Sequence, residues 1–443
     1  MLKIYSCHVY SWKETKRRND EMDLKAKQQN RTYKFLIIIF AVIMLMFSVS
    51  SVYSYFRDST KDYGKLYQTG RTVLSGGDIY VTGDQTFQFI YPPTAAIFYA
   101  LLSTFGLLPM IVILVFANSA AWIASVFLSV YLTTGKVLRQ HPLLYLVPTA
   151  CCIPYVWDIF QLGQINLLLF VCMLVAFVCL QRKREWYAGV LIALAASLKA
   201  FPVLTLVYLL YRRRWKAVLS TVVLLFFFLV LLPIPFRGVQ RNLQDIKTWT
   251  QGMVFHYDTN SIAQRPSRGY SLKNQSLVAV ANRLLRPVDA YRSHENPIYV
   301  NFADIEFKYL NAIILAAALG LCLFYVTSMP HYTQRTMGSD SIEYAMMLIL
   351  ILIFTPLSFT YFYVWLLYPL MVAVNILLTR PYLFRTWKMT LVWFVICVLL
   401  LSFMLPVPGF DQLAARGSTF WACVLLLFGL GWKQRQLKAP IAQ

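Results

Sequence analysis

The chain has little charge for its size: 14% of its 443 residues are Asp, Glu, Lys or Arg, whereas 58% are hydrophobic. Soluble globular domains have about 25% charged and about 45–50% apolar residues. Apolar runs long enough to cross a bilayer recur along the chain, which predicts an all-α polytopic membrane protein. Unbroken runs such as 216–235 lack the in-and-out alternation of a membrane β-barrel and exclude that class.

Several sequence patterns are also missing. There is no GxxxxGK[ST] loop, no GxGxxG turn and no soluble domain large enough to hold a nucleotide sugar, so any transferred group must come from a donor in the bilayer. The runs 216–235 and 387–405 contain no acid or base relay, which argues against a proton-coupled transporter. The cysteines show no zinc-binding spacing, and the basic N-terminal segment has no pattern of a cleavable signal peptide.

The net charge of +22 is interpreted as an excess of Lys and Arg at the cytoplasmic ends of membrane spans, and not as a nucleic-acid-binding surface. Placing the basic clusters in the cytoplasm predicts twelve crossings with both termini inside. The expected crossings are 35–55, 109–133, 142–158, 164–181, 186–199, 201–211, 216–235, 306–328, 341–355, 362–378, 387–405 and 417–432.

Two long segments then lie outside the membrane, at 56–108 and 236–305. Segment 93–107 is apolar, but a crossing there would place Lys136 and Arg139 outside, so we expect an interfacial helix. Loops of this length usually carry function or are disordered, and their aromatic content favours function. The predicted parts are a basic N-terminal segment 1–34, a catalytic module 35–235, the outer loop 236–305, C-terminal helices 306–432 and a tail 433–443.

The first outer segment places a carboxylate, Asp62, close to the membrane surface. It lies in DYGKLY and is followed by the turn-forming stretches GGDIY and YPP. A carboxylate held there suits a general base acting on a sugar hydroxyl, and Asp58 is its main rival. The residues of this segment expected to contact substrate are Tyr63, Tyr67, Tyr80 and Tyr91.

A second candidate is Lys199, in the stretch AASLKAFP between two short apolar runs. A lysine within an apolar stretch is costly and marks a functional site, although it can also reach the interface by snorkelling. There its ammonium could hold a phosphate at headgroup level. The motif GQIN adds two amides, Gln164 and Asn166, which either bind sugar hydroxyls or cap a helix.

The second outer segment is rich in cations that could bind phosphate: Arg237, Arg241, Arg265, Arg268, Lys273, Arg283 and Arg286. We predict substrate contacts from Arg265 and Arg268, and from Asn274 and Ser276 of the motif NQSL. The stretch TPLSFTYFYVWLLYP, 355–369, is either an aromatic belt or a platform for sugar or acceptor, with Tyr361 and Tyr363 as its candidate binding residues.

With these motifs in this order, the chain resembles the GT-C superfamily of membrane glycosyltransferases, and within it glycosyltransferase family 87. The resemblance covers residues 35–430 and rests on DYGKLY, GGDIY, YPP, LGQIN, AGVLIALAASLKAFPVL with RRRW, NQSL and TPLSFTYFYVWLLYP. It implies the GT-C fold and a polyprenyl-phosphate sugar donor, with mannose as the sugar many members use. Asp62 matches the catalytic carboxylate of the family, whereas 358–363 has Tyr and Phe where members often carry His.

The function expected is transfer of a mannose-like hexose or pentose to a glycan or glycolipid acceptor on the outer face of a bacterial inner membrane. Asp62 would be the base of an inverting displacement, and Lys199 would stabilise the leaving phosphate. We expect neither a metal ion nor another cofactor, and no nucleic-acid partner. Two alternatives remain: a transporter or flippase of lipid-linked glycans, and a ligase or polymerase with a polyprenyl-pyrophosphate donor.

Overall fold

The computed structural model describes residues 34–35, 37–80, 89–138, 140–252, 269–290, 297–379, 384–405 and 407–438. A first unit ends at Val49 and a second runs from Ser50 to Gln443, and the helices from α2 onward belong to the second. Within the described residues, β pairing is limited to one isolated bridge, Asn274 with Phe359. The predicted all-α class is therefore confirmed.

Among the described residues, seven helices are long and apolar enough to cross a membrane. They are Ile37–Phe56, α4 (Leu107–Thr134), α5 (Pro142–Leu162), Trp215–Arg237, α14 (Phe307–Ser328), α15 (Met337–Phe354) and Thr360–Thr379. Shorter apolar helices are α3 (Pro93–Ser103), α6 (Asn166–Gln181), α7 (Glu185–Leu198), Phe201–Tyr211 and Trp387–Ser402. The chain is thus a polytopic membrane protein, and the count of twelve crossings stays a prediction.

Some helix ends differ from those predicted. Helix α5 continues past 158 to Leu162 because Gly163, at φ +66°, is the first residue to leave the helical conformation. Helix α19 (Ser418–Lys438) runs into the segment predicted to be a tail. The first outer segment folds as α2 (Lys61–Leu74) and α3. Helix α3 begins at residue 93, as predicted for segment 93–107, but it ends at Ser103.

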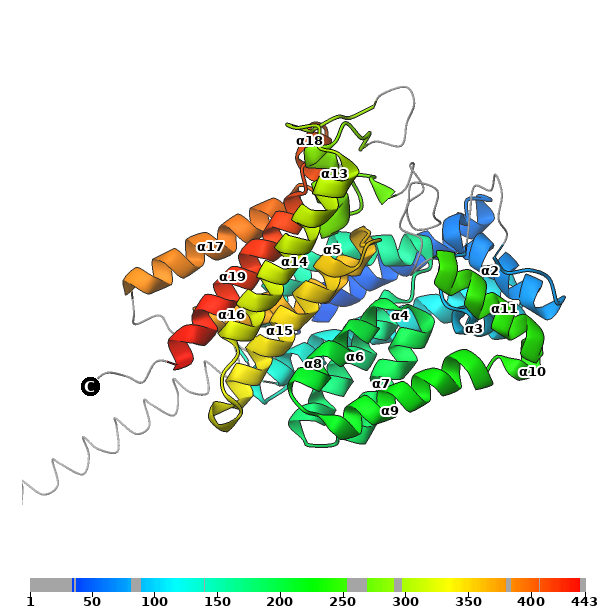
Figure 1. Cartoon of the computed structure of the whole chain (residues 1–443), viewed down its shortest axis with the longest axis horizontal. Helices are drawn as coiled ribbons and strands as arrows, with labels where there is room; N and C mark the ends of the chain where they lie inside the picture. The colour runs from blue at the N-terminus through cyan, green and yellow to red at the C-terminus, as the bar shows by residue number, and fades with distance from the viewer. Residues whose placement is uncertain are drawn as a thin grey trace, which may run out of the picture. The chain divides into compact units, whose positions relative to one another are not determined.

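Small residues allow the helices around the site to pack closely. Helix α2 lies on α3 at Gly70, where a Cβ atom would come within 2.5 Å of the carbonyl oxygen of Tyr99. Helix α7 packs against α6 and α9 (Trp215–Phe226), and a Cβ on Gly189 would lie 2.6 Å from the carbonyl oxygen of Ala217 (Figure 1). Small residues at helix contacts are typical of membrane proteins.

Helix α9 is fastened to α3 and to the helices that follow it. It widens into a π-turn, η2 (Phe227–Leu231), and continues through α10 (Ile234–Arg237) to α11 (Val239–Thr250). The Thr94 hydroxyl donates to the carbonyl of Phe228 at 2.7 Å, and the Asn242 amide donates to that of Val230 at 2.8 Å. Carbonyl groups released by the π-turn are therefore satisfied by neighbouring helices.

The C-terminal half adds a second group of helices. Helices α14, α15 and α19 lie side by side, and α17 (Phe384–Ser402) packs on α19 (Figure 1). Helix α16 (Leu367–Thr379) contacts α4 and α5, and so joins this group to the N-terminal helices. Helix α13 (Leu277–Leu285) contacts α14 and α15, and the short α18 (Asp411–Ala415) contacts α19.

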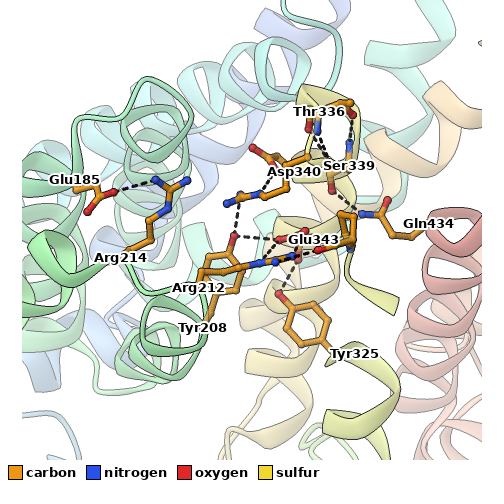
Figure 2. Close-up of polar contacts among 12 residues, drawn as sticks. Glu185, Tyr208, Arg212, Arg214, Tyr325, Thr336, Ser339, Asp340, Glu343 and Gln434 are labelled. Atoms are coloured by element: carbon orange, nitrogen blue, oxygen red, sulfur yellow. Dashed lines mark hydrogen bonds and ion pairs between the residues drawn. The ribbon is translucent and has the colours of Figure 1, made fainter. Parts of the chain in front are cut away.

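A buried charge cluster ties α8 (Thr205–Tyr211) to α15 (Figure 2). The guanidinium of Arg212 forms a two-point ion pair with the fully buried carboxylate of Glu343, with Nε 3.1 Å from Oε2. The same guanidinium donates to the carbonyl of Pro330 at 3.0 Å, and the Tyr208 hydroxyl donates to Glu343 at 3.2 Å. This cluster was not predicted from the sequence, in which a Glu and an Arg at the edges of apolar runs were the available signal.

Candidate active site

The LGQIN turn between α5 and α6 is the centre of the candidate site. Gly163 is in the left-handed conformation, and a Cβ atom there would lie 2.6 Å from the ring of Tyr63. Both the backbone and the close ring contact therefore require glycine. The turn buries Gln164 and Asn166, and the amide of Asn118 holds it by donating to the carbonyl of Gln164 at 3.1 Å.

The side chain of Gln164 connects the predicted base to the predicted phosphate-binding cation. Its Nε2 donates to Oδ2 of Asp62 at 3.3 Å. Its Oε1 accepts from Nζ of Lys199 at 2.7 Å and from the hydroxyl of Tyr91 at 3.1 Å. Four residues predicted separately from the sequence thus meet at one amide group.

Lys199 is buried at the break between α7 and the 3₁₀ turn η1 (Phe201–Leu204), with 3% of its surface exposed. Its Nζ also donates to Oδ1 of Asn166 at 2.6 Å. The rings of Tyr91, Tyr361 and Phe362 surround the ammonium, with centroids 4.7, 4.9 and 5.1 Å away. Hydrogen bonds and cation–π contacts offset part of the cost of burying this charge.

A cleft of about 380 Å³ opens over Lys199. It is lined by Lys199, by Ala200, Phe201, Val203 and Leu204 after it, and by 354–357 at the end of α15. Aromatic side chains complete the lining, including Tyr91, Tyr361 and Trp249. The cleft is mainly apolar with one cation at its inner surface, which fits a ligand that combines a hydrocarbon chain with an anionic group.

Trp249 was not identified from the sequence. It lies on α11, and its Nε1 donates to the carbonyl of Ile90 at 3.1 Å, next to the YPP stretch. The available signal was an aromatic residue on a polar helix directly after an apolar run, but that pattern also occurs in interfacial anchors.

Asp62 lies in the first turn of α2 and is half-buried. Two contacts fix this turn: the Tyr63 hydroxyl donates to the carbonyl of Phe160 at 2.8 Å, and Nζ of Lys61 donates to Oε1 of Gln161 at 2.9 Å. Among the described residues, Gln164 is the only hydrogen-bond partner of the Asp62 carboxylate. Asp58 is exposed and lies before the turn, so Asp62 is the better placed of the two carboxylates.

The GGDIY stretch is held by two cations that were candidates for binding phosphate. Arg237 is buried, pairs with Asp245 at 2.8 Å and donates to the carbonyl of Gly77 at 2.8 Å. Arg241 pairs with the exposed Asp78 at 2.7 Å, and this hydrogen bond and charge lower the pKa of that carboxyl. Both arginines thus have partners within the fold.

Tyr80 and Tyr67 also lie in the first outer segment. The hydroxyl of Tyr80 donates to the carbonyl of Tyr91 at 2.6 Å, so Tyr80 helps to hold the YPP stretch in place. Tyr67 is half-buried on α2, one turn after Tyr63. The predicted substrate contacts of both residues stay predictions.

The NQSL motif is engaged with backbone groups. The side chain of Asn274 donates to the carbonyls of Gly269 and Pro356 at 2.9 and 2.8 Å, and accepts from the amide of Ser358 at 3.1 Å. The Ser276 hydroxyl caps α13 by accepting from the amide of residue 279, and donates to the carbonyl of Pro356 at 2.9 Å. These side chains secure the turn at 356–358, which forms part of the cleft wall.

Of the remaining predicted residues that the structure describes, one contacts Lys199 and others bond to backbone carbonyls. Tyr361 faces Lys199, whereas the hydroxyl of Tyr363 donates to the carbonyl of Gln275 at 2.8 Å. Arg283 is buried and donates to several backbone carbonyls, including that of Ala415 at 2.6 Å. Arg265 and Arg268 lie outside the described residues.

The part of the chain that the structure describes contains no group of three or more His, Cys, Asp or Glu that could hold a metal, and the expectation of a metal-free reaction stays a prediction.

The family model for glycosyltransferase family 87 matches residues 89–356, which include YPP, LGQIN, Lys199 and NQSL. The chain belongs to glycosyltransferase family 87. It is therefore a membrane glycosyltransferase, as the motifs predicted.

Two bacterial proteins are similar to parts of this family 87 chain. One is a polyprenol-phosphate-mannose-dependent alpha-(1-2)-phosphatidylinositol pentamannoside mannosyltransferase of Mycobacterium tuberculosis, 34% identical over 197 residues. The other is a polyprenol-phosphate-mannose-dependent alpha-(1-2)-phosphatidylinositol mannoside mannosyltransferase of Mycolicibacterium smegmatis, 30% identical over 178 residues. The matches cover 41% and 36% of this chain, and 44% and 38% of the respective relatives.

Proposed function

We propose that this family 87 glycosyltransferase moves a sugar from a polyprenyl-phosphate donor to a glycan or glycolipid acceptor, with inversion at the anomeric carbon. The observation that carries the proposal is the Gln164 amide, which joins Asp62 to Lys199. A carboxylate and an ammonium one amide apart match the two needs of this reaction, a base for the acceptor and a cation for the leaving group.

The proposed reaction is a single displacement. The acceptor oxygen forms a bond to the anomeric carbon while the bond from that carbon to the phosphate oxygen breaks. The acceptor proton goes to the carboxylate of Asp62, and polyprenyl phosphate leaves with the electron pair. Lys199 offsets the negative charge that develops on the phosphate, which in other enzymes is worth about 10²–10³ in rate for a single donor.

The cleft supports a prenyl-linked donor. Its apolar lining suits the first isoprene units of the donor, and Lys199, which is part of that lining, would bind the attached phosphate. The described arginines Arg237 and Arg283 have partners elsewhere in the fold, so Lys199 is the cation we assign to the phosphate. Arg265 and Arg268 remain additional candidates for this role.

The names of the two relatives favour mannose as the sugar and a phosphatidylinositol mannoside as the acceptor. Tyr361 and Phe362 stand beside Lys199 in the stretch where family members often carry His. Sugar selection there would rest on ring contacts in place of an imidazole, and for this reason the donor proposed includes other hexoses and pentoses.

We also propose a topology for the chain in the membrane. Twelve crossings, with α3 in the outer interface and the GT-C arrangement of helices, would put Asp62 and Lys199 at the outer face of a bacterial inner membrane. The interfacial assignment of α3 is supported by the basic residues Lys136 and Arg139, which a crossing at α3 would place outside.

The test uses the purified full-length protein in detergent with radiolabelled polyprenyl-phosphate mannose and a phosphatidylinositol mannoside acceptor. We expect label to move to the acceptor with release of polyprenyl phosphate. Transfer from a polyprenyl-pyrophosphate glycan alone would favour the ligase or polymerase alternative. No transfer from any lipid-linked sugar, combined with glycolipid movement across proteoliposomes, would refute the proposal and favour a transporter.

A further inference from the structure

We propose that Gln164 is a positioning residue whose amide keeps the base Asp62 and the cation Lys199 from pairing with each other. This inference rests on the proposed function, because it takes Asp62 and Lys199 in the roles given to them there. It replaces the predicted sugar contact of Gln164 with a role toward two protein charges.

The chemistry of the neighbours fixes the orientation of the amide. An ammonium only donates hydrogen bonds, so the atom 2.7 Å from Nζ of Lys199 must be the amide oxygen. An ionised carboxylate only accepts, so the atom 3.3 Å from Oδ2 of Asp62 must be the amide nitrogen. The donors and acceptors thus form one ordered chain from ammonium through amide to carboxylate, and such chains polarise in the same direction.

The amide has no freedom to leave this position. Gln164 is 1% exposed, its oxygen also accepts from the Tyr91 hydroxyl at 3.1 Å, and its backbone carbonyl accepts from Asn118. The turn that carries it is fixed by Gly163 against the ring of Tyr63. Gln164 therefore acts as a rigid spacer and not as a side chain that reorients around a ligand.

A spacer is needed because Asp62 and Lys199 have opposite charges, and because Lys199 is buried and Asp62 half-buried on either side of one amide. A direct ion pair would occupy the ammonium that the phosphate requires and the carboxylate that the acceptor hydroxyl requires. In an in-line displacement the attacking and leaving oxygens lie on opposite sides of the anomeric carbon. The base and the cation must therefore remain apart, and one interposed amide achieves this.

The experiment is a double-mutant cycle on the binding of tritiated undecaprenyl phosphate to the purified full-length protein. The variants are Gln164→Met, Asp62→Asn and the combination of both. We expect Gln164→Met to weaken binding at least tenfold when Asp62 is present, because Lys199 then pairs with Asp62. In the Asp62→Asn background the same change should cost less than threefold, since no carboxylate remains to capture the ammonium.

The matched control is Gln434→Met, the same substitution at another buried glutamine, which lies on α19. Gln434 donates to the carbonyl of Ser339 at the start of α15, whereas the cleft lies at the end of that helix, so the control should alter undecaprenyl phosphate binding less than twofold. If Gln164→Met fails to fold, Gln164→Asn, which is too short to reach both charges, should give the same pattern.

Equal losses of binding in the two backgrounds would mean that Gln164 acts only as structure, and would overturn the inference while leaving the proposed function intact. A wild-type protein that neither binds undecaprenyl phosphate nor transfers sugar from its derivatives would refute the proposed donor and the inference together. A fully folded Gln164→Met variant with wild-type binding would overturn the inference alone.

Discussion

The buried pair of Arg212 and Glu343 gives a prediction whose size follows from the structure. Glu343 is fully buried, and its carboxylate is satisfied by the guanidinium of Arg212 and the hydroxyl of Tyr208. Replacing Arg212 with Met leaves this carboxylate buried without an ion-pair partner in direct contact, with the Tyr208 hydroxyl as a donor and Arg335 one hydroxyl away at 3.4 Å from Tyr208. Removing one partner of a buried ion pair costs about 3–5 kcal/mol, because the other charge stays behind unpaired.

This cost can be expressed as a change in melting temperature. An unfolding entropy of about 2 cal/mol/K per residue over 443 residues converts a loss of about 3–5 kcal/mol into a fall of about 3–5 °C. Replacing both residues, as Arg212→Met with Glu343→Met, removes both charges, so most of the loss should be recovered. The assay is thermal unfolding in detergent at one fixed scan rate, followed by tryptophan fluorescence.

The chain provides a matched control two residues away. Arg214 pairs with Glu185 at 2.9 Å, but their side chains are 23% and 16% exposed. A pair that retains solvent contact is worth about 0–1 kcal/mol, so Arg214→Met should lower the midpoint by about 1 °C or less. The reasoning is refuted if Arg214→Met is as damaging as Arg212→Met, or if the double replacement at 212 and 343 is no better than the single one.

Three further predictions concern the site. Lys199→Met should lower kcat for sugar transfer by about 10²–10³, and a kcat within threefold of wild type would show that no phosphate charge is stabilised there. Gly163→Ala should cost about 2 kcal/mol or more in thermal unfolding, from the left-handed backbone and the 2.6 Å approach to Tyr63, and an unchanged midpoint would contradict this packing. Asn274→Ala should cost about 1–3 kcal/mol, because buried backbone groups lose their partners, with KM for donor and acceptor unchanged. A raised KM with an unchanged midpoint would instead make Asn274 a substrate contact.

Residues whose chemistry is costly in their surroundings could be predicted from the sequence. Lys199 stood out because an ammonium in an apolar stretch must have a partner or a function, and the structure supplies the partners Gln164 and Asn166. Asp62 stood out because carboxylates are scarce in this chain. The all-α class followed from the length of the apolar runs alone.

Residues with polar side chains that suit several roles could not be assigned in this way. Asn274 and Ser276 are predicted to bind substrate, and this stays a prediction; their side chains hold backbone groups, and no local pattern separates the two uses. Trp249 and Glu343 depend on partners 159 and 131 positions away in the chain, which a single sequence does not bring together. Arg237 was a candidate for binding phosphate. Its ion pair with Asp245 was not foreseen, because Asp245 lies on helix α11 in a segment that was predicted to be a loop.

The most direct test of the account is the turnover of Asp62→Asn in the purified transfer assay, compared with Asp58→Asn. Asp62→Asn should lower kcat by about 10²–10⁴ while undecaprenyl phosphate still binds, since only the base is lost. Asp58→Asn should stay within threefold of wild type, because Asp58 is exposed and lies before the turn that carries Asp62. Full turnover by folded Asp62→Asn, or a large loss at Asp58 alone, would contradict the assignment of Asp62 as the base.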